Sequence, residues 1–405
     1  MIKKYTRLYL AGFVAIIFIL AWGCAVFSGK EVSRKASLKK LFTFQYPEFT
    51  DDMSFDGLDS SILMSLSYLD KVSEDRNFEF GKDVYTAKQM KQSLLCFMNF
   101  INTHPAAAEI NQFIKKSFYV YKSTGNKKKK VLFTGYYEPV LKGSLNRTPV
   151  YQYPIYEKPG DHTIIDLSLF SPEFKGKKII GRFTDNTVVP YYERKEIEDM
   201  ALFRDAATPI CWVSDQTDLF FLQIQGSGKI CLQNGDMINV HYHTTNGHPY
   251  RSIGKLLIEE GKIDQSQISM QKIKDYITHH PDEQAKIFNT NPSYVFFKRE
   301  VDGPFGCLEV KLTPGRSAAT DRRLFPDAAL MFIRSHKPVL DGDGNIDAWI
   351  PFERFTLNQD TGGAIKGPGR CDLFCGNDKY AEIAAGNMRH EGDMYFFILK
   401  PGPNR

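Results

Sequence analysis

The sequence lacks the motifs through which many proteins bind metals or nucleic acids. Its cysteines show no zinc-ligand spacing, and it has neither a nuclear-type basic cluster nor an RNA-recognition signature. The formal net charge is a mild +5. The most local basic run, residues 127–130, is typical first of a solvated loop and only second of a contact with a polyanion. We therefore expect no metal, no other cofactor and no nucleic-acid partner.

The sequence also has no coiled-coil heptads, no fixed-period repeat and no low-complexity linker, so we expect a monomer. The chain has 405 residues, of which 42% are hydrophobic. Because single hydrophobic cores stop growing at roughly 250–300 residues, a chain of this length and composition is expected to form two domains.

The N-terminus has the three-part pattern of an export signal, in which a basic start precedes an apolar run over residues 8–22. Residues 20–24 resemble a bacterial lipoprotein processing box, whose cysteine, here Cys24, is lipidated and becomes the mature N-terminus. An uncleaved anchor helix and ordinary secretion are the alternatives, although the run is shorter than the roughly 20 residues that span a bilayer. We expect residues 1–24 to be a signal and the protein to be a periplasm-facing outer-membrane lipoprotein of the bacterial cell envelope.

Export places the six remaining cysteines where disulfides are allowed. Most of them have apolar neighbours in the sequence, which favours buried thiols that pack as small hydrophobic side chains. Cys371 and Cys375 flank Asp372, but no histidine motif lies close in sequence, as a nucleophilic cysteine would need. We interpret both as packing residues beneath a site, with a local disulfide as the alternative.

Hydrophobic periodicity divides the chain into helical and β segments. Apolar residues recur at helical spacing over about residues 52–118, where Thr86 is a predicted helix cap. Short apolar runs over residues 150–240, among them residues 219–224, alternate with turn residues as in an all-β barrel or sandwich. A mostly helical interlude over residues 252–288 precedes a glycine-rich, β-like segment that continues almost to the C-terminus.

The most informative cluster lies in this last segment, where Asp360 and Asp372 bracket a loop of glycines with Lys366 and Arg370. Glycines let the backbone approach a ligand closely, and the pKa of an aspartate beside cations and N–H groups is set by those surroundings. The cluster predicts an acid–base site, and a plain turn between strands is the alternative.

Two further clusters indicate a sugar site. Residues 134–139 place a hydroxyl, two aromatic rings and a carboxylate at a strand end, although tyrosines of a core strand would look the same. Residues 223–228 offer two amides and the hydroxyl of Ser227. We do not expect Ser227 to be a nucleophile, because β-structure rather than a helix follows it. His248 is interpreted as a structural hydrogen-bonding residue.

Taken together, the clusters resemble the membrane-bound lytic murein transglycosylase A family, which carries a C-terminal three-aspartate (3D) domain. The resemblance spans about residues 133–400 and implies a carbon–oxygen lyase that acts on peptidoglycan, an exotransglycosylase. Such an enzyme cleaves the β-1,4 bond between N-acetylmuramic acid and N-acetylglucosamine without water and leaves 1,6-anhydromuramoyl ends. The matching motifs, in the order of the family, are residues 134–139, 225–228, 246–254, 291–297, 312–321 and 360–376.

The reaction that the resemblance implies needs only one catalytic carboxyl group, because the C6 hydroxyl of the substrate attacks its own anomeric carbon. The resemblance assigns this acid–base role to Asp372 and a supporting catalytic role to Asp360. Because Asp372 must be protonated first, we predict that desolvation and Asp360 raise its pKa, which Lys366 would oppose if close. The substrate-binding residues that the resemblance implies are Thr134, Tyr136, Gln225, Ser227, Lys366 and Asp321.

The resemblance also implies a mainly β fold, α+β overall, with flanking helices. A double-psi β-barrel would be formed by residues 45–138 and 290–405, with the 3D domain at about residues 305–400. A second β-barrel would be inserted at residues 139–289, and glycan strands of peptidoglycan would bind in a groove between the two barrels. Two alternatives stay open: an expansin-like wall-binding protein that does not cut, and a conventional glycoside hydrolase with Glu138 as second carboxylate.

Overall fold

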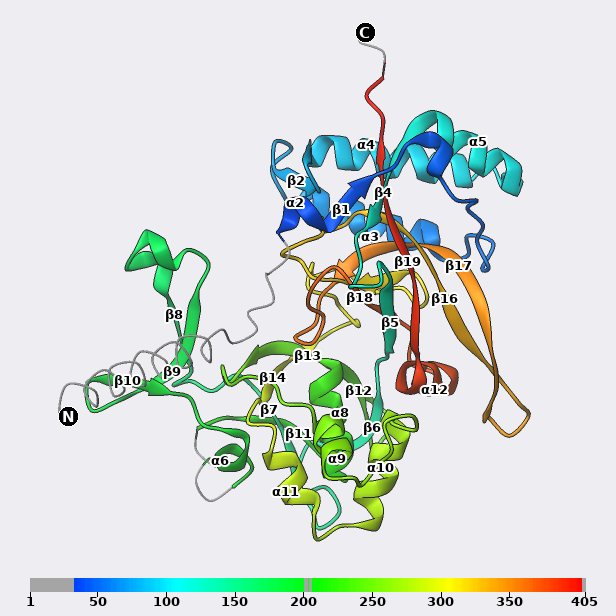
Figure 1. The fold of residues 1–405 in the computed structure, drawn as a ribbon. Helices are drawn as coiled ribbons and strands as arrows, with labels where there is room; N and C mark the ends of the chain where they lie inside the picture. The colour runs from blue at the N-terminus through cyan, green and yellow to red at the C-terminus, as the bar shows by residue number, and fades with distance from the viewer. Residues whose placement is uncertain (1–32, 200–202, 204–205, 403–405) are drawn as a thin grey trace, which may run out of the picture. The chain divides into compact units, whose positions relative to one another are not determined.

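The computed structural model describes residues 33–199, 203 and 206–402 (Figure 1). The predicted signal, with Cys24, lies outside the described residues. Within these ranges no helix is long and apolar enough to cross a membrane.

Six strands close into a first barrel, because β19 pairs with β16 on one side and with β5 on the other. Two pairs, β15–β17 and β18–β5, are parallel, and the remaining pairs of the barrel are antiparallel. Parallel pairing requires long connections, and β5 accordingly lies beside C-terminal strands that follow much later in the chain (Figure 1). The strands are β5 (Val131–Tyr136), β15 (Ser317–Ala319), β16 (Leu330–Leu340), β17 (Ile346–Asp360), β18 (Arg370–Phe374) and β19 (Arg389–Leu399).

The strands β4 (Phe118–Ser123) and β1 (Leu38–Lys40) extend the barrel sheet beyond β19. Four helices pack on this sheet: α3 on β17, α4 on β19, α5 on β4, and α12 (Lys379–Asn387) on β5. The Thr86 side chain accepts a hydrogen bond from Gln89 N, which confirms the predicted cap of α4. The bounds of the N-terminal elements are α2 (Arg34–Ser37), η1 (Thr43–Gln45), α3 (Leu58–Asp70), β2 (Asn77–Phe80), β3 (Asp83–Thr86), α4 (Ala87–Ile101) and α5 (Ala107–Ser117).

A buried ion pair ties the segment before α3 to the barrel. The side chains of Arg316 and Asp51 are 0% and 1% exposed, and Arg316 Nη1 and Nη2 donate to Asp51 Oδ2 and Oδ1 over 2.7 and 2.8 Å. Arg316 also donates to the carbonyl oxygens of Asp56 and Phe355, over 2.8 and 2.9 Å. The guanidinium is therefore fully engaged, as a buried charge requires.

A second six-stranded sheet, in the order β14-β13-β12-β6-β11-β7, is formed by five strands from residues 139–289 and by β14, which lies beyond them. A parallel bridge between Glu157 and Phe297 joins the end of β7 to β14, so this sheet also closes. β14 follows residue 289, where the sequence places the end of the insertion. The strands are β6 (Val140–Ser144), β7 (Tyr153–Tyr156), β11 (Pro209–Val213), β12 (Ser227–Leu232), β13 (Met237–Thr245) and β14 (Val295–Glu300).

Residues 219–224, which the sequence predicts as a strand, form part of helix α8 (Gln216–Gln225) instead. The side chain of Asp215 accepts a hydrogen bond from Asp218 N and caps the helix, while Gly226, with φ of 83°, ends it. The prediction was wrong because the helix is buried nearly all round, so its sequence shows no polar face that would reveal helical spacing.

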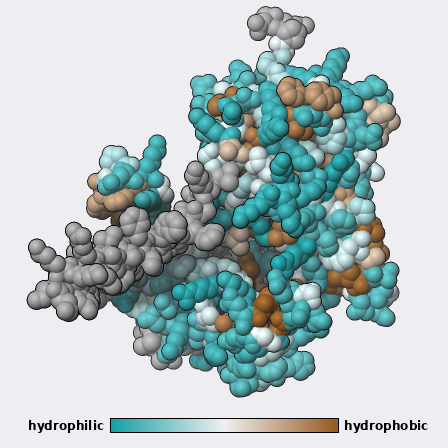
Figure 2. Space-filling view, viewed as in Figure 1, coloured by the Kyte–Doolittle hydropathy of each residue, from teal (hydrophilic) through white to brown (hydrophobic). Residues whose placement is uncertain are grey.

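The predicted helical interlude is confirmed, and Ser252 caps its first helix through Lys255 N. A helix in the last segment, α12, was not predicted. A small separate sheet, β10-β9-β8, also belongs to the insertion. The bounds are β8 (Thr163–Asp166), η2 (Leu167–Leu169), η3 (Pro172–Phe174), β9 (Lys178–Thr184), β10 (Thr187–Pro190), α6 (Arg194–Glu198), α9 (Ile253–Glu259), α10 (Met270–His279), α11 (Gln284–Asn289) and α12 (Lys379–Asn387). The face seen in Figure 2 is mostly hydrophilic and carries separate apolar patches.

Candidate active site

Asp372 lies in the middle of β18, between β5 and β15 of the first barrel. It is in register with Thr134 on β5 and with Ala319 on β15, and Ala319 is in turn in register with Asp360 at the end of β17. One strand thus separates the two aspartates, which places their backbones about 10 Å apart at the usual strand spacing. Strand pairing therefore brings together the two carboxylates that the sequence analysis singled out.

Two hydroxyl groups of β5 each donate to one of these aspartates. Thr134 Oγ1 donates to Asp372 Oδ1, and Tyr136 Oη donates to Asp360 Oδ2 over 2.9 Å. Residues two apart on a strand share a face, so a single strand aligns both donors. The Tyr136 ring packs against Phe374, with 5.3 Å between the ring centroids.

Asp360 is held by three hydrogen-bond donors. Besides Tyr136, the backbone N–H groups of Cys307 and Thr361 donate to Oδ1 over 2.9 and 2.8 Å. Burial nevertheless raises the pKa of Asp360 to about 6, because desolvation of the charged form outweighs these donors. Both oxygens are engaged as acceptors, which suits a carboxylate with a fixed orientation.

Asp372 has fewer partners and is partly accessible, with 19% of its side chain exposed. Burial raises its pKa to about 6; the Arg370 guanidinium opposes this rise, and the negative charge of Asp360 adds to it. The predicted rise in pKa and its two causes are thereby confirmed. The cation that opposes it is Arg370, however, whereas Lys366 is exposed.

Arg370 belongs to the cluster that the sequence analysis described, but it was not named among the catalytic or substrate-binding residues. Its Nη2 donates to Thr134 Oγ1 over 3.1 Å and lies 3.4 Å from Asp372 Oδ1, so arginine, threonine and aspartate form a chain of hydrogen bonds. Its Nε is buried and has no partner among the described residues. The sequence contained an indication of this contact, because side chains two residues apart on a strand lie on the same face, and Arg370 lies two residues before Asp372.

Gln225 of the inserted barrel contacts the segment that follows β5, whereas Ser227 contacts only the second sheet in the observed pairing. Gln225 ends α8, and its Oε1 accepts a hydrogen bond of 3.1 Å from Tyr137 N, which directly follows β5. Ser227 begins β12 and is in register with His241 of β13. The side chain of Gln225 therefore links the inserted barrel to the strand that carries Thr134 and Tyr136.

Asp321 fixes the glycine loop, residues 361–369. It is 2% exposed, and its Oδ2 accepts hydrogen bonds of 2.8 Å from both Gly367 N and Arg323 Nη2. Its Oδ1 accepts from Arg323 N and Nε. The contacts of Asp321 are thus with the protein, and its substrate contact stays a prediction.

The cysteines around Asp372 are free thiols, as are the others in the described part of the chain. Cys371 is buried, and Cys375 Sγ lies 3.5 Å from Leu373 O. Burial raises the pKa of the Cys375 thiol to about 12 and that of Cys371 still further, so both are protonated and poor nucleophiles. These contacts fit packing residues. The described residues also contain no group of three or more side chains suited to a metal ion.

Glu138, the candidate second carboxylate, is only 1% exposed. Lys229 Nζ lies 3.3 Å from its Oε2, and Asn377 Nδ2 donates to the same oxygen over 3.1 Å. Burial raises the pKa of Glu138, and the Lys229 charge opposes this rise. The group is enclosed by protein partners that join β12 to the first barrel.

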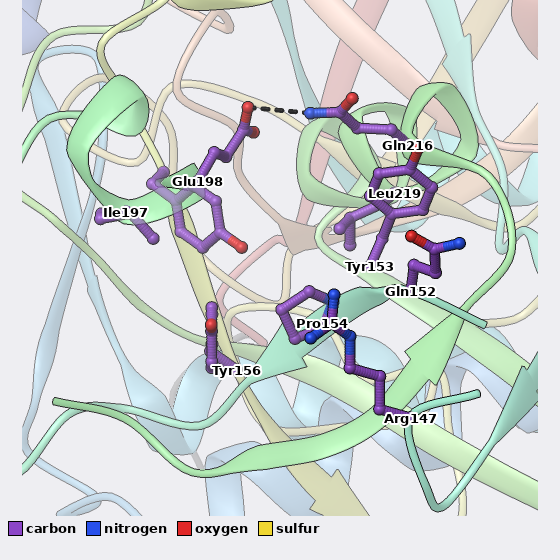
Figure 3. Close-up of a pocket in the computed structure, with 10 residues that line it drawn as sticks. Arg147, Gln152, Tyr153, Pro154, Tyr156, Ile197, Glu198, Gln216 and Leu219 are labelled. Carbon is purple, nitrogen blue, oxygen red and sulfur yellow. Dashed lines mark hydrogen bonds between the residues drawn. The ribbon is translucent and has the colours of Figure 1, made fainter. Parts of the chain in front are cut away.

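A cavity of about 130 Å³ lies in the inserted barrel, apart from the residues described above. Gln216 Nε2 donates to Glu198 Oε2 over 3.1 Å at its wall (Figure 3). None of its lining residues belongs to the Asp372 site. They are Arg147, Gln152, Tyr153, Pro154, Tyr156, Ile197, Glu198, Gln216, Leu219 and Tyr294.

Comparison with known families assigns both parts of the chain. A family model described as the MltA specific insert domain matches residues 132–298, and the 3D domain model matches residues 316–398. Membrane-bound lytic murein transglycosylase A of Escherichia coli strain K12 is 30% identical over 275 residues, which cover 67% of this chain and 67% of that protein. The chain belongs to the membrane-bound lytic murein transglycosylase A family. This confirms the resemblance drawn from the six motifs.

Solved structures of the lytic murein transglycosylase A family share the fold. The membrane-bound lytic murein transglycosylase of Agrobacterium tumefaciens has a TM-score of 0.72 and 28% identity, covering 90% of this chain and 98% of that one. MltA of Neisseria gonorrhoeae has a TM-score of 0.66 and 27% identity, covering 91% and 93%. E. coli MltA with bound chitohexaose has a TM-score of 0.69 and 24% identity, covering 93% of this chain and 97% of that one. At this identity the likeness supports the shared fold and nothing further. The predicted fold class, a double-psi β-barrel with an inserted barrel, is confirmed.

Proposed function

We propose that Asp372 is the one proton-transferring residue of this peptidoglycan lytic transglycosylase. The activity class follows from the family, whose members are enzymes that act on peptidoglycan and are named lytic murein transglycosylases. The observation that supports Asp372 is the contrast between the two aspartates. Both oxygens of Asp360 accept hydrogen bonds, from Tyr136 and from two backbone N–H groups, whereas Oδ2 of Asp372 accepts none from the described residues and is left for a transferred proton.

The reaction begins with protonated Asp372. Its proton passes to the glycosidic oxygen between N-acetylmuramic acid and N-acetylglucosamine while the C6 hydroxyl oxygen attacks the anomeric carbon. The C–O bond to the leaving sugar breaks, and that sugar departs with its hydroxyl group. The carboxylate then accepts the proton of the C6 hydroxyl, which leaves a 1,6-anhydromuramoyl end and regenerates the acid. Water is neither consumed nor produced.

The contacts of Asp372 suit this proton shuttle. Thr134 and Arg370 both approach Oδ1, which leaves Oδ2 for the transferred proton. A pKa of about 6 keeps a sizeable protonated fraction near neutral pH and still gives a carboxylate that accepts a proton afterwards. When Asp360 is ionised, its negative charge raises the pKa of Asp372 and would stabilise positive charge that develops on the sugar ring.

Substrate contacts are proposed for the residues that surround this pair. Thr134, Tyr136, Gln225 and Ser227 would contact the glycan strand in a groove between the two barrels. Lys366 is exposed on the glycine loop, where its charge suits carboxylates of the substrate. Asp321 would act through the loop that it fixes.

A conventional hydrolase with Glu138 as second carboxylate is less well supported. In hydrolases the second carboxylate must reach the sugar or a water molecule beside it. The Glu138 side chain is 1% exposed and is occupied by Lys229 and Asn377. A non-cutting, expansin-like protein would not need an aspartate with a raised pKa.

The family name places the protein in the cell envelope, because its relatives are called membrane-bound. We further propose that it is an outer-membrane lipoprotein, lipidated at Cys24, facing the periplasm as a monomer. Labelling with a radioactive or clickable fatty acid tests this attachment. Label that persists in a Cys24→Ala variant would refute lipidation at this residue.

The decisive test of activity is the mass of released muropeptides. Purified sacculi incubated with the full chain in detergent should release fragments with anhydro ends, each lighter by one water than a hydrolytic end. Reducing ends would show hydrolysis, and the absence of release together with binding would show a wall-binding protein; either result would overturn the proposal.

A further inference from the structure

Two exposed phenylalanines, one at the start of η1 and one within it, form an apolar surface without a partner among the other described residues. Phe42 and Phe44 are 67% and 83% exposed, and their rings stack with 5.6 Å between centroids and 4° between planes. In Figure 2 an apolar patch lies over the part of the molecule that holds η1 and α5. Exposed aromatic pairs of this kind mark interaction surfaces, because leaving them in water is costly.

The backbone that carries these rings is held firmly on the barrel sheet. Leu41, the residue before Phe42, donates a hydrogen bond of 2.9 Å from its backbone N to Val120 O. On the other side, Tyr46 Oη donates to Phe118 O over 3.1 Å and accepts from Val120 N over 3.2 Å. The fold therefore presents both rings outward.

Basic side chains lie near the strands β1 and β4, to which this backbone is attached. Lys40 Nζ lies 3.5 Å from the centroid of the Tyr119 ring, and Lys400 Nζ lies 5.8 Å from it and donates to Lys115 O over 2.6 Å. The Asp83 carboxylate forms an ion pair of 3.2 Å with Lys40 and so offsets part of the positive charge of these lysines. We call this surface the basic–aromatic edge: Phe42, Phe44, Tyr119, Lys39, Lys40, Lys115, Lys116 and Lys400.

We propose that the basic–aromatic edge docks onto the surface of an anionic phospholipid bilayer. The two rings would enter the boundary between headgroups and acyl chains, and the lysines would face lipid phosphates. The position of the edge in the chain supports this occupant. The N-terminal stretch outside the described structure ends at residue 32, ten residues before Phe42, and contains the apolar run 8–22. This inference rests on the proposed membrane attachment, because an N-terminal anchor holds the edge close to the bilayer.

The docking would act as a second membrane contact beside the anchor. A single lipid chain binds membranes only marginally, and a basic patch is a common second signal. Two contacts would also restrict the rotation of the enzyme relative to the membrane, which a flexible tether alone does not do.

A fragment without the anchor tests the edge directly. Arg34–Arg405 forms one compact unit and contains all four described hydrophobic cores, so a fragment that starts at residue 34 is suitable. We expect it to co-sediment with vesicles of phosphatidylethanolamine and phosphatidylglycerol at least about tenfold better than with phosphatidylcholine vesicles. Binding should fall with added salt.

The double variant Phe42→Ser/Phe44→Ser should lower vesicle binding by at least about tenfold. Lys39→Gln and Lys116→Gln should each lower it about fivefold. A matched control is Phe170→Ser/Phe183→Ser, which changes one phenylalanine that follows η2 and one on β9, 75% and 68% exposed, and should bind as the unchanged fragment does. Muropeptide release should be the same for all these variants, so a failure of docking is distinct from a failure of the proposed activity.

Equal vesicle binding by Phe42→Ser/Phe44→Ser and the unchanged fragment would overturn the proposal. So would equal binding to neutral and anionic vesicles. Loss of binding to sacculi rather than to vesicles in this variant would also overturn it, since the rings would then serve the glycan.

Discussion

Thr134 and Asp372 lie directly opposite each other in the parallel pair β5–β18, and the hydroxyl group of Thr134 donates to the carboxylate of Asp372. Strand register rather than a flexible side-chain network therefore sets the orientation of the proposed acid. The same strand aligns Tyr136 with Asp360. Displacement of β5 by one residue would separate both hydroxyl groups from their partners.

Replacement of Thr134 tests this alignment. Thr134→Val keeps the shape of the side chain but removes the donor, and a hydrogen bond to a charged group contributes about 1.5–3 kcal/mol. We expect kcat for muropeptide release to fall roughly 10- to 100-fold with a smaller change in KM. Thr134→Ser keeps the hydroxyl and should retain most of the activity. Equal losses in both variants would indicate a steric effect.

Asp372→Asn should abolish nearly all release of anhydromuropeptides, because loss of a general acid typically costs about 10²- to 10⁴-fold in rate. Asp347→Asn, at an exposed position of β17, is the matched control and should keep full activity. Thermal unfolding of both variants checks that the fold is intact. Full activity of a folded Asp372→Asn variant would refute the assignment.

The charges next to Asp372 should shift the pH profile in opposite directions. Activity requires the protonated acid, so kcat/KM should fall as the pH rises through about 6. Arg370→Gln removes the cation that lowers this pKa and should move the fall to higher pH. Asp360→Asn removes the negative charge that raises it and should move the fall to lower pH. Shifts in the same direction for both variants would contradict this electrostatic arrangement.

The same titration should appear in the free energy of unfolding. The pKa of Asp372 is raised from 3.8 to about 6 in the folded state, so its neutral form stabilises the fold below about pH 4. This contribution is lost as the pH rises through about 6. Asp372→Asn does not titrate and should therefore gain about 1–3 kcal/mol relative to the unchanged protein between pH 4 and 7.5. Urea unfolding at both pH values measures the difference, and a constant difference would contradict it.

The ion pair between Arg316 and Asp51 gives a test of stability. Asp51→Ala leaves the Arg316 guanidinium buried without its carboxylate, which should lower the free energy of unfolding by about 3–5 kcal/mol. Asp343→Ala, in an exposed turn, should change it by less than about 0.5 kcal/mol. Chemical unfolding measures both. Equal effects would show that the pair contributes little.

Much of the fold was predictable where local signals agree with tertiary packing. The cap at Thr86 and the cap at Ser252 mark helix starts that the structure contains. The strand prediction for residues 219–224 was wrong because a helix that is buried on most sides has a continuous apolar sequence, and such a sequence is equally typical of a buried strand. The family could be predicted from the six motifs because their order along the chain is more specific than any single motif.

The site was predictable in its residues more than in its contacts. The sequence indicates Asp360 and Asp372 as partners, and the structure places them on strands on either side of β15. It does not reveal that Arg370, rather than Lys366, is the cation beside the acid, because that depends on which face of β18 points toward Thr134. The donors to Asp360 from Cys307 and Thr361 are backbone groups, which leave no trace in residue type.

The hydrogen bond between Thr134 and Asp372 joins residues 238 positions apart, and the strand that closes the barrel, Arg389–Leu399, is the last strand in the part of the chain that the structure describes. A nascent or truncated chain that ends before this strand contains both residues but has no closed barrel to desolvate the acid. A site with a desolvated acid therefore requires a strand that follows Asp372 in the chain. We therefore expect copies that lack this strand to be inactive on the cell wall.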